Sequence, residues 1–280
     1  MRINEQTVRK YRGDLFMRGA RGLVARDFKK QPVNKIQWDA SSAIIPRSEW
    51  AELIEAQAES KSRVSDIRNV ADNGKPMASL DQGQQGYCWA YSTVACMMLT
   101  RAIANMPYER LSPHAIGCML MNFRNRGAWG ALAMEFASRQ GCPTEEFWPQ
   151  KSMSKGNDNE VTWEDARRFK VTEGYLDIEV DAWDADLGFD LVASLLLQRV
   201  PCVLDFGWWG HSVCGMDLID LQNGKPDSDI ARWGILILNS WTDLWGEDGT
   251  AIIEGRKCIP MGSCAARVLM GEIDEKVVEE

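Results

Sequence analysis

The hydrophobic and polar positions follow different patterns in the two halves of the chain. Residues 63–142 show a helical pattern, clearest between Cys88 and Thr100, where no residue is charged. A helix that is apolar on all sides is typical of a buried one. A second helix is expected to begin at Pro113 with Ser112 as its N-cap. The spacing predicts further helices at residues 48–60, 130–139 and 188–198.

The second half contains short apolar runs typical of β-strands. They lie at residues 201–206, 211–221, 233–241 and 250–254. Between the second and third runs, Asn223-Gly-Lys-Pro-Asp227 is a strong turn signal, so these two strands are predicted to pair antiparallel. A turn centred on residue 225 would place His211 opposite Asn239. The fold class expected is α+β, a helical lobe followed by an antiparallel β-rich lobe.

The charge is divided unevenly along the 280 residues. The net charge is −8, yet residues 1–36 hold ten Lys and Arg against three acidic residues, about +7, which leaves about −15 on the remainder. This balance argues against whole-protein nucleic-acid binding. We expect residues 1–36 to be a docking arm for an acidic surface, either the protein's own surface, as a latch, or a neighbouring subunit. The apolar residues 15–17, 23–24 and 28 would add hydrophobic anchors to such an arm.

Neither a membrane nor a metal ion is expected. No run approaches the ~18 apolar residues of a membrane span, and the start of the chain lacks the apolar stretch of a signal peptide. A cytoplasmic location is therefore expected, with a virus particle as the alternative. The eight cysteines occur singly, several in apolar runs, and are expected to be mostly reduced core residues. No Cys-x-x-Cys occurs and His114 and His211 are the only histidines, so neither a metal site nor a cofactor is predicted.

Cys88 differs from the other cysteines in its position. It begins the long apolar helix and follows Gln82-Gly-Gln-Gln-Gly-Tyr87, where two glycines let the backbone turn sharply. A helix N-terminus and a nearby imidazolium both lower a thiol pKa, which a nucleophilic thiolate needs. An isolated cysteine is usually a core residue, and that remains the interpretation of Cys96, Cys118, Cys202 and Cys214.

Five segments together resemble papain-like cysteine peptidases. They are Gln82-Gly-x-x-Gly-x-Cys-Trp-Ala-Tyr-Ser92, Leu111-Ser-Pro113, Pro201-Cys-Val-Leu204, His211-Ser-Val-Cys-Gly215, and Asn239-Ser-Trp241 followed by Trp245-Gly-x-x-Gly249. Roughly residues 64–270 follow the order of that family. The resemblance implies a two-lobe fold with an active-site cleft between the lobes.

The same resemblance implies a role for each matching residue. Cys88 would be the nucleophile, His211 the base and Asn239 the residue that orients the imidazole. The side chain of Gln82 would join the backbone N–H of Cys88 in stabilising the oxyanion. Trp241 would shield the His–Asn hydrogen bond, although an ordinary core indole is an equal alternative. The residues expected to contact substrate are Trp89, Trp209, Gly210 and Trp241, while His114 is expected to be structural.

The resemblance also sets the expected domains. Residues 1–62 would form an extension, basic and then helical; residues 63–270 would form the papain-like domain, with 63–180 mainly helical and 181–270 mainly β; residues 271–280 would form an acidic tail. The extension does not show the usual inhibitory propeptide pattern, although a segment of that length could occupy the cleft.

The chain departs from the family pattern at several positions. Gln85-Gly-Tyr87 stands where relatives carry a disulfide-forming cysteine, so the usual cleft-side disulfide cannot form. The stretch 205–210 before His211 is short and carries Trp208 and Trp209, which leaves the substrate preference open and allows Trp209 to act as a lid or a platform. Thr242 and Thr250 are further departures.

Three functions remain open from the sequence. The leading hypothesis is a thiol-dependent peptidase or amide hydrolase acting on a protein or peptide through an acyl-enzyme. A second is acyl transfer from the same thiolate to an amine. A third is a structural or binding component of a large assembly such as a bacteriophage particle, docked through residues 1–36.

Overall fold

The computed structural model describes residues 1–8, 20–31, 44–172, 174–180 and 185–266. Its helices are α2 (Arg47–Glu59), α3 (Val64–Arg68), α4 (Cys88–Ile103), α5 (Pro113–Met121), α6 (Gly130–Gln140), α7 (Glu160–Arg167) and α8 (Ala185–Leu197), with 3₁₀ turns at Lys155–Asn157, Ile230–Arg232 and Gly255–Cys258. None of the described helices is long and apolar enough to cross a membrane. The expected tail 271–280 and the apolar residues 15–17 lie outside the described residues.

Seven strands form one sheet. They are β1 (Arg2–Ile3), β2 (Tyr175–Glu179), β3 (Cys202–Phe206), β4 (His211–Asp220), β5 (Trp233–Leu238), β6 (Thr250–Glu254) and β7 (Gly262–Ala266). Their order is β1-β6-β5-β4-β3-β7-β2. β1 pairs parallel with β6, whereas the other strand pairs are antiparallel, as expected for this lobe. A two-residue strand carries too little pattern to be predicted from sequence.

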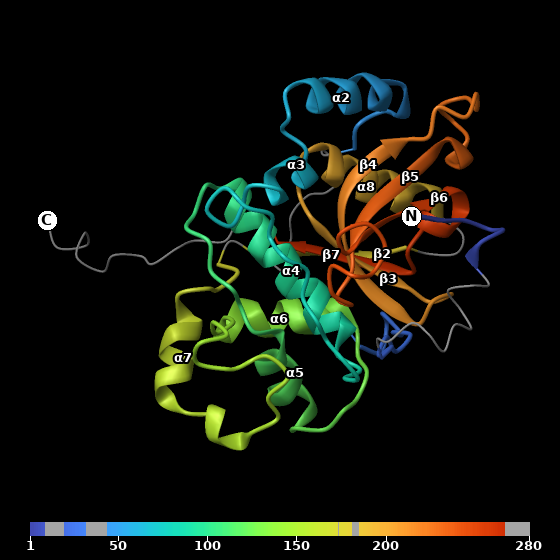
Figure 1. Ribbon diagram of the computed structural model, residues 1–280. Coiled ribbons are helices and arrows are strands. Elements are labelled where there is room, and N and C mark those ends of the chain that lie inside the picture. Colours follow the sequence, from blue (N-terminus) through green and yellow to red (C-terminus); the bar gives the residue numbers. More distant parts are fainter. Residues whose placement is uncertain (9–19, 32–43, 173, 181–184, 267–280) are drawn as a thin grey trace, which may run out of the picture.

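The helices and the sheet form two lobes, as the α+β expectation requires (Figure 1). Helices α4, α5, α6 and α7 gather on one side, and α4 packs against both the helices and the strands β3 and β4. Helices α2 and α8 pack together and against β4. Trp50 of α2 is fully buried, edge-on to Phe189 and Trp233. The helical part of the N-terminal extension is therefore built into the core of the β-rich lobe.

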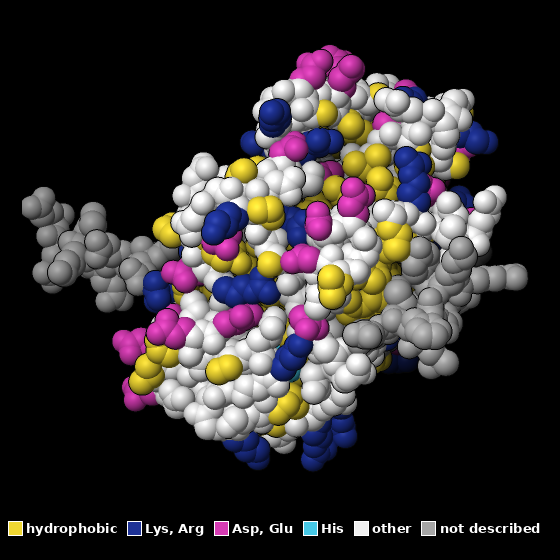
Figure 2. All heavy atoms as spheres, viewed as in Figure 1, with side chains coloured by type: hydrophobic (Ala, Val, Ile, Leu, Met, Phe, Trp, Pro, Cys, Tyr) yellow, Lys and Arg dark blue, Asp and Glu magenta, His cyan; other side chains and the backbone are white. Residues whose placement is uncertain are grey.

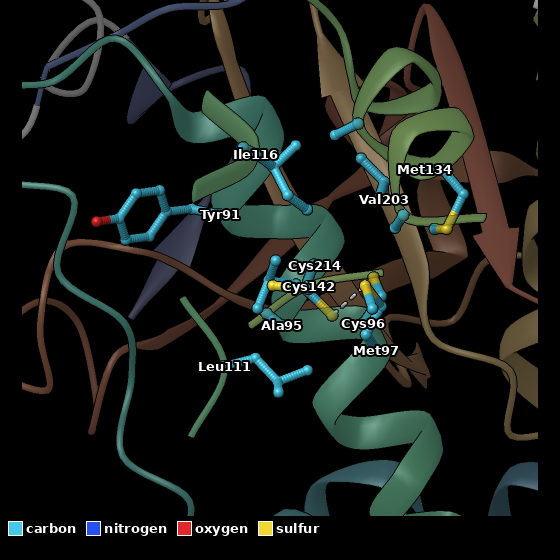
Figure 3. Close-up of a cluster of buried hydrophobic side chains, with 14 of the residues drawn as sticks. Tyr91, Ala95, Cys96, Met97, Leu111, Ile116, Met134, Cys142, Val203 and Cys214 are labelled. Carbon is cyan, nitrogen blue, oxygen red and sulfur yellow. Dashed lines mark hydrogen bonds between the residues drawn. The ribbon is translucent and has the colours of Figure 1, made fainter. Parts of the chain in front are cut away.

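Helix α4 is buried on nearly all sides, as its uncharged sequence predicts. Its residues meet the sheet in a sulfur-rich core, where the sulfur atoms of Cys96 and Cys214 lie 3.3 Å apart (Figure 3). All eight cysteines are buried, as expected of core residues, and none is paired in a disulfide in this structure.

Ser112 is the N-cap of α5 and Pro113 its first residue, as expected, but the Ser112 side chain makes no capping hydrogen bond and its buried hydroxyl has no partner among the described residues. The expected register of β4 and β5 needed correction. Next to the turn, Asp220 lies opposite Trp233, three residues away from the register calculated for a turn centred on residue 225. A β-bulge between Gly215 and Asp217 then reduces the difference to two residues where Cys214 lies opposite Leu238. Because side chains alternate with a period of two, this even shift leaves His211 and Asn239 on one face.

Candidate active site

Cys88 is the first residue of α4 and is fully buried. Its sulfur accepts hydrogen bonds from the backbone of Ser212 and from the backbone of Gly22. Burial is the largest influence on the thiol and raises its pKa to about 11, although both hydrogen bonds lower it. The lowered thiol pKa expected from the helix N-terminus is therefore absent in this state, because burial outweighs it.

His211 and Asn239 come together where β4 begins and β5 has just ended. The ring nitrogen Nε2 of His211 lies 2.8 Å from Oδ1 of Asn239, which also accepts the backbone N–H of Ser240 at 2.8 Å. An oxygen that accepts a backbone N–H must face that group, so Nε2 of His211 is the donor and carries the proton. Nδ1 of His211 is buried without a partner among the described residues and is left as the basic nitrogen. The sequence prediction that these two residues meet is confirmed.

Indole rings surround this histidine. The ring centroid of Trp241 lies 4.4 Å from that of His211, and that of Trp209 lies 4.9 Å from it. Trp209 is 1% exposed, so its ring is not an open platform in this state, and its role as a lid stays a prediction. Rings that exclude water from the His–Asn pair keep its hydrogen bond in a low dielectric, where it is stronger.

Gln82 is fully buried, and its orientation is set by Ser240. The hydroxyl of Ser240 donates to Oε1 of Gln82 at 2.5 Å, and the backbone N–H of Gln82 bonds the carbonyl of Ser240. The amide nitrogen Nε2 must then point the other way, where it donates to the carbonyls of Ala20 and Gln85, each at 2.7 Å. Gln82 thus presents a hydrogen-bond donor, as an oxyanion-stabilising residue must.

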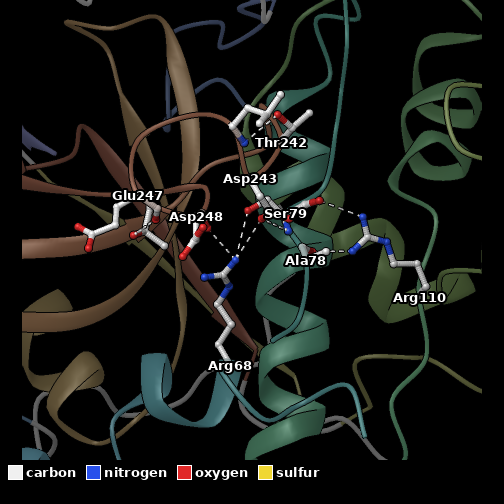
Figure 4. Close-up of polar contacts among 10 residues, drawn as sticks. Arg68, Ala78, Ser79, Arg110, Thr242, Asp243, Glu247 and Asp248 are labelled. Atoms are coloured by element: carbon white, nitrogen blue, oxygen red, sulfur yellow. Dashed lines mark hydrogen bonds and ion pairs between the residues drawn. The ribbon is translucent and has the colours of Figure 1, made fainter. Parts of the chain in front are cut away.

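A polar network braces the segment that carries Gln82 against the loop after Asn239 (Figure 4). The guanidinium of Arg68 donates to the carbonyl of Asp248 at 2.8 Å and approaches Asp243 and the Ser79 hydroxyl. Arg110 donates to the carbonyls of Ala78 and Ser79 from the opposite side. These contacts tie the segment before Gln82 to the loop after Asn239, although the two segments are far apart in sequence.

The cleft is filled by residues 20–28, which we call the strap. Leu23 forms a parallel bridge with Ala128: Ala128 donates to the carbonyl of Gly22, and Val24 donates to the carbonyl of Ala128, both at 2.9 Å. Leu23 also donates to the carbonyl of Gly210 at 3.2 Å. The strap therefore lies against both lobes and covers the sulfur of Cys88.

The strap also sets the charge state of His211. Burial lowers its pKa to about 3, the hydrogen bond to Asn239 opposes this, and the positive charge of Arg21 lowers it further. A thiol with a pKa of about 11 and an imidazole with a pKa of about 3 are both neutral at pH 7. The covered site is at rest, without a thiolate–imidazolium pair.

The remaining predicted site residues divide clearly. Gly210 contacts the strap through its carbonyl. Trp89 is fully buried in this state and donates its indole N–H to the carbonyl of Gly86 at 3.0 Å, and its contact with substrate stays a prediction. His114 is buried and bonds Tyr91 at 2.6 Å, which fits the structural role expected of it. The described residues include no group of three or more His, Cys, Asp or Glu side chains placed to hold a metal ion.

Sequence reasoning missed two contributors to the site. Ser240 was part of the Asn-Ser-Trp segment but had no assigned task. The strap was expected only as part of a docking arm, without a statement of where that arm would bind. The signal that could have located it is Gly22, whose lack of a side chain permits the contact with the backbone of Gly86.

Curated relatives and solved structures point to one family, although no protein-family model matches the chain. The chain is 24% identical over 192 residues to the cathepsin B-like protein CP2 and 26% identical over 186 residues to CP3, both from Giardia intestinalis. Each match covers 61% of this chain, and the chain spans 61% of the length of CP2 and 62% of that of CP3.

The fold matches that of xylellain, a cysteine protease from Xylella fastidiosa, with a TM-score of 0.58 at 16% identity, over 91% of this chain and 97% of xylellain. A recombinant stem bromelain precursor matches with a TM-score of 0.54 at 17% identity, over 92% of this chain and 79% of the precursor. The chain is thus similar in sequence to cathepsin B-like proteins, and its fold is the papain-like fold of these solved cysteine proteases.

Proposed function

We propose that the chain is a cysteine peptidase that cleaves peptide bonds through Cys88, His211 and Asn239, and that the strap holds it in a blocked form. The observation that carries this proposal is the pair His211–Asn239, whose hydrogen bond leaves Nδ1 of His211, the residue before Ser212, as a base with no partner in the described part of the chain. The backbone of Ser212 bonds the sulfur of Cys88. The proposed base His211 is thus the neighbour in sequence of a residue that contacts the proposed nucleophile Cys88 at the start of α4.

The proposed reaction follows from these positions. With the strap displaced, Nδ1 of His211 takes the thiol proton, and the thiolate of Cys88 attacks the carbonyl carbon of the substrate. The carbonyl oxygen becomes an oxyanion and accepts the Nε2–H of Gln82. His211 then protonates the leaving amine, an acyl-enzyme forms on Cys88, and water hydrolyses it with His211 again acting as base.

The strap contacts Gln82 and Cys88 in a geometry that does not lead to its own cleavage. Gln82 donates to the carbonyl of Ala20, the kind of oxygen it would bind in a substrate. The sulfur of Cys88 meets the backbone of Gly22 through a hydrogen bond. A sulfur that accepts an N–H is not aligned on a carbonyl carbon, so the strap can fill the site without being cleaved there.

Labelling by an epoxide-type thiol-peptidase inhibitor tests the proposal. In Gly22→Val, designed to displace the strap, mass mapping should find the label on Cys88 alone among the eight cysteines, and an unstructured protein substrate should be hydrolysed. Cys88→Ala in the same background should lose both, and Asn239→Ala should retain slow labelling. Absence of labelling and of hydrolysis in the strap-displaced variant would refute the peptidase and favour a binding module.

Acyl transfer is distinguished in the same experiment. The same Cys88 acyl-enzyme could be attacked by an amine instead of water. With an added primary amine, a hydrolase yields mainly free acid and a transferase yields mainly the amide. We expect the acid, and a product that is mostly amide would replace hydrolysis by transfer.

A further inference from the structure

The strap ends in a buried ion pair beyond the catalytic residues. Arg26 donates from both terminal nitrogens to the two carboxylate oxygens of Asp177, at 2.7 and 3.0 Å. The side chains of Arg26 and Asp177 are only 5% and 6% exposed. Two parallel hydrogen bonds of this kind match the planar fork of a guanidinium to a carboxylate.

Aromatic rings complete this site. The guanidinium carbon of Arg26 lies 4.3 Å from the ring centroid of Phe28 and 5.9 Å from that of Trp129. Phe28 belongs to the strap itself, whereas Trp129 belongs to the body of the protein and follows Ala128, the residue that pairs with the strap. A cation beside an aromatic ring is favoured by the charge distribution of the ring.

A second buried carboxylate makes this end of the cleft more negative. Asp205 is 7% exposed and accepts hydrogen bonds from the backbone of Gly130 at 3.2 Å and from the hydroxyl of Ser212 at 2.5 Å. Burial raises the pKa of Asp205 to about 6, and the charge of Arg26 lowers it. Asp205 has partners within the body of the protein, whereas the two hydrogen bonds described for Asp177 both come from the strap.

The ion pair lies on the path that the strap takes through the cleft. From the contact at Cys88 the strap passes Ala128 and reaches Asp177 four residues after Gly22. Asp177 sits on β2, the outermost strand of the sheet beside β7, so only one of its flanks is paired. A substrate that replaces the strap therefore meets the same carboxylate.

We infer that Asp177 and Trp129 form a specificity subsite that selects a basic side chain, arginine above lysine, in a peptide substrate. This inference rests on the proposed peptidase function. Arginine reproduces both hydrogen bonds of Arg26, whereas lysine offers a single point charge. An apolar side chain would leave the carboxylate of Asp177 buried without a counter-charge, which is costly, so most of the discrimination is a penalty against the wrong residue.

Peptide binding tests the subsite without any need for turnover. The full chain carrying Cys88→Ala, Gly22→Val and Arg26→Met is titrated with a fluorescent nonapeptide of the strap sequence 20–28. A second nonapeptide carries norleucine in place of the arginine at position 26. The arginine peptide should bind at least ~10-fold more tightly, about 1.4 kcal/mol. Equal affinity for the two peptides, or no measurable binding of either, overturns the subsite.

Two further variants identify the residue responsible. Asp177→Asn should reduce the ratio of the two affinities to within ~3-fold and should bind the norleucine peptide at least as well as the parent does. A misfolded protein would bind neither peptide, so folding failure is recognised. Asp186→Asn, a matched change at an exposed residue of α8, should leave the ratio unchanged. A ratio that survives Asp177→Asn assigns the preference elsewhere and refutes the inference.

Hydrolysis separates this inference from the proposed function. With Cys88 intact, the Gly22→Val, Arg26→Met chain is given a fluorogenic peptide library that varies one position at a time. Cleavage confined to peptides with a basic residue supports both proposals. Cleavage with no basic preference refutes the subsite alone, and arginine-selective binding without cleavage or inhibitor labelling refutes the peptidase alone.

Discussion

Two concave regions of the molecule differ in what occupies them. The cleft at Cys88 is filled by the protein's own strap, and its reactive groups bond that strap. A groove of about 620 Å³ lies elsewhere, with Arg63, Arg68 and Asp243 among its lining residues, and its charged groups bond each other or nearby backbone. The groove near Arg68 therefore has a structural role, whereas the reactive residues lie in the cleft that the strap covers.

The surface shows the same contrast in charge. On the face seen in Figure 2, Lys and Arg side chains alternate with Asp and Glu, and no single sign dominates. In the cleft, by comparison, the strap contributes Arg21 and Arg26 and the body contributes Asp177 and Asp205, while the strap's own Asp27 is exposed and pairs with Lys30. The basic character of the N-terminal residues therefore finds an acidic counterpart inside the protein, which supports the latch among the docking alternatives.

The largest expected effect comes from forcing the strap out of the cleft. A Cβ atom at Gly22 would lie 1.8 Å from the carbonyl oxygen of Gly86, so Gly22→Val cannot be accommodated without moving the strap. The rate at which an epoxide inhibitor labels Cys88 should rise roughly 100-fold. This corresponds to a loss of about 2.7 kcal/mol from the free energy that favours the covered state.

The matched control for this change is Gly156→Val. A Cβ atom at Gly156 meets only the Ser154 hydroxyl, at 3.4 Å, so labelling should stay within ~2-fold of that of the unmodified chain. If Cys88 in the Gly22→Val variant is labelled at the same rate as in the unmodified chain, the strap does not control access to Cys88. The cleft would then not differ from the groove in being closed by the strap.

Arg68→Met tests whether the open groove is bracing. Arg68 is 4% exposed and joins α3 to the Asp243 and Asp248 loop, so its loss removes the donor to the Asp248 carbonyl and the counter-charge of Asp243, which keeps only the backbone N–H of Ser79 among the hydrogen bonds described for it. The free energy of unfolding, measured in urea, should fall by about 2–3 kcal/mol. Glu247→Gln, at a groove residue whose side chain is 84% exposed, should change it by less than ~0.5 kcal/mol. Equal stability of both variants would contradict the bracing role.

The fold was largely accessible from sequence because its signals are local. Several elements could be predicted from their own residues alone. They are the helix after Cys88, from its uncharged run, the helix that starts at Pro113, and the strands β3 and β6, from their apolar runs. The strand β1 and the exact β4–β5 register were missed, since the first has too few residues and the second depends on how a long connection folds.

The candidate site was accessible for a different reason. Cys88, His211 and Asn239 were found through ordered family motifs, and the structure brings the last two into contact. The neutral charge state of the site was not accessible, because it arises from burial under the strap, a contact between segments that no local pattern records. A cytoplasmic location stays a prediction.

Acidification should open the strap. In a Cys88→Ala chain, where no thiolate can form, the pKa of His211 is about 3 when covered and near the ordinary ~6.5 when uncovered. The uncovered form binds more protons between these values, so lowering the pH favours it, by about 2 kcal/mol at pH 5.

The amide signal of Gly22 in a ¹⁵N NMR spectrum reports the covered population between pH 7 and 5. His211→Gln in the same background should abolish its own part of the pH dependence, and what remains measures groups such as Asp205, whose pKa burial raises to about 6. A covered population that is constant over this range would show that burial of His211 does not resist opening.

Ser240→Ala should have the smallest effect and tests how the oxyanion donor is oriented. Without the Ser240 hydroxyl, Oε1 of Gln82 loses its donor and the amide can rotate to present its oxygen to the cleft. Loss of one oxyanion donor typically costs ~2.7–4 kcal/mol of barrier, and partial misorientation should cost about 1.4 kcal/mol, a tenfold fall in kcat with little change in KM. The assay uses the Gly22→Val background, and Ser138→Ala, whose hydroxyl bonds only the carbonyl of Glu135 among the described contacts, serves as the control.

In a double-mutant cycle, Ser240→Ala should add nothing to the loss of kcat once Gln82→Ala is present, because the serine acts through the glutamine. Additive effects would show that Ser240 supports the site by another route.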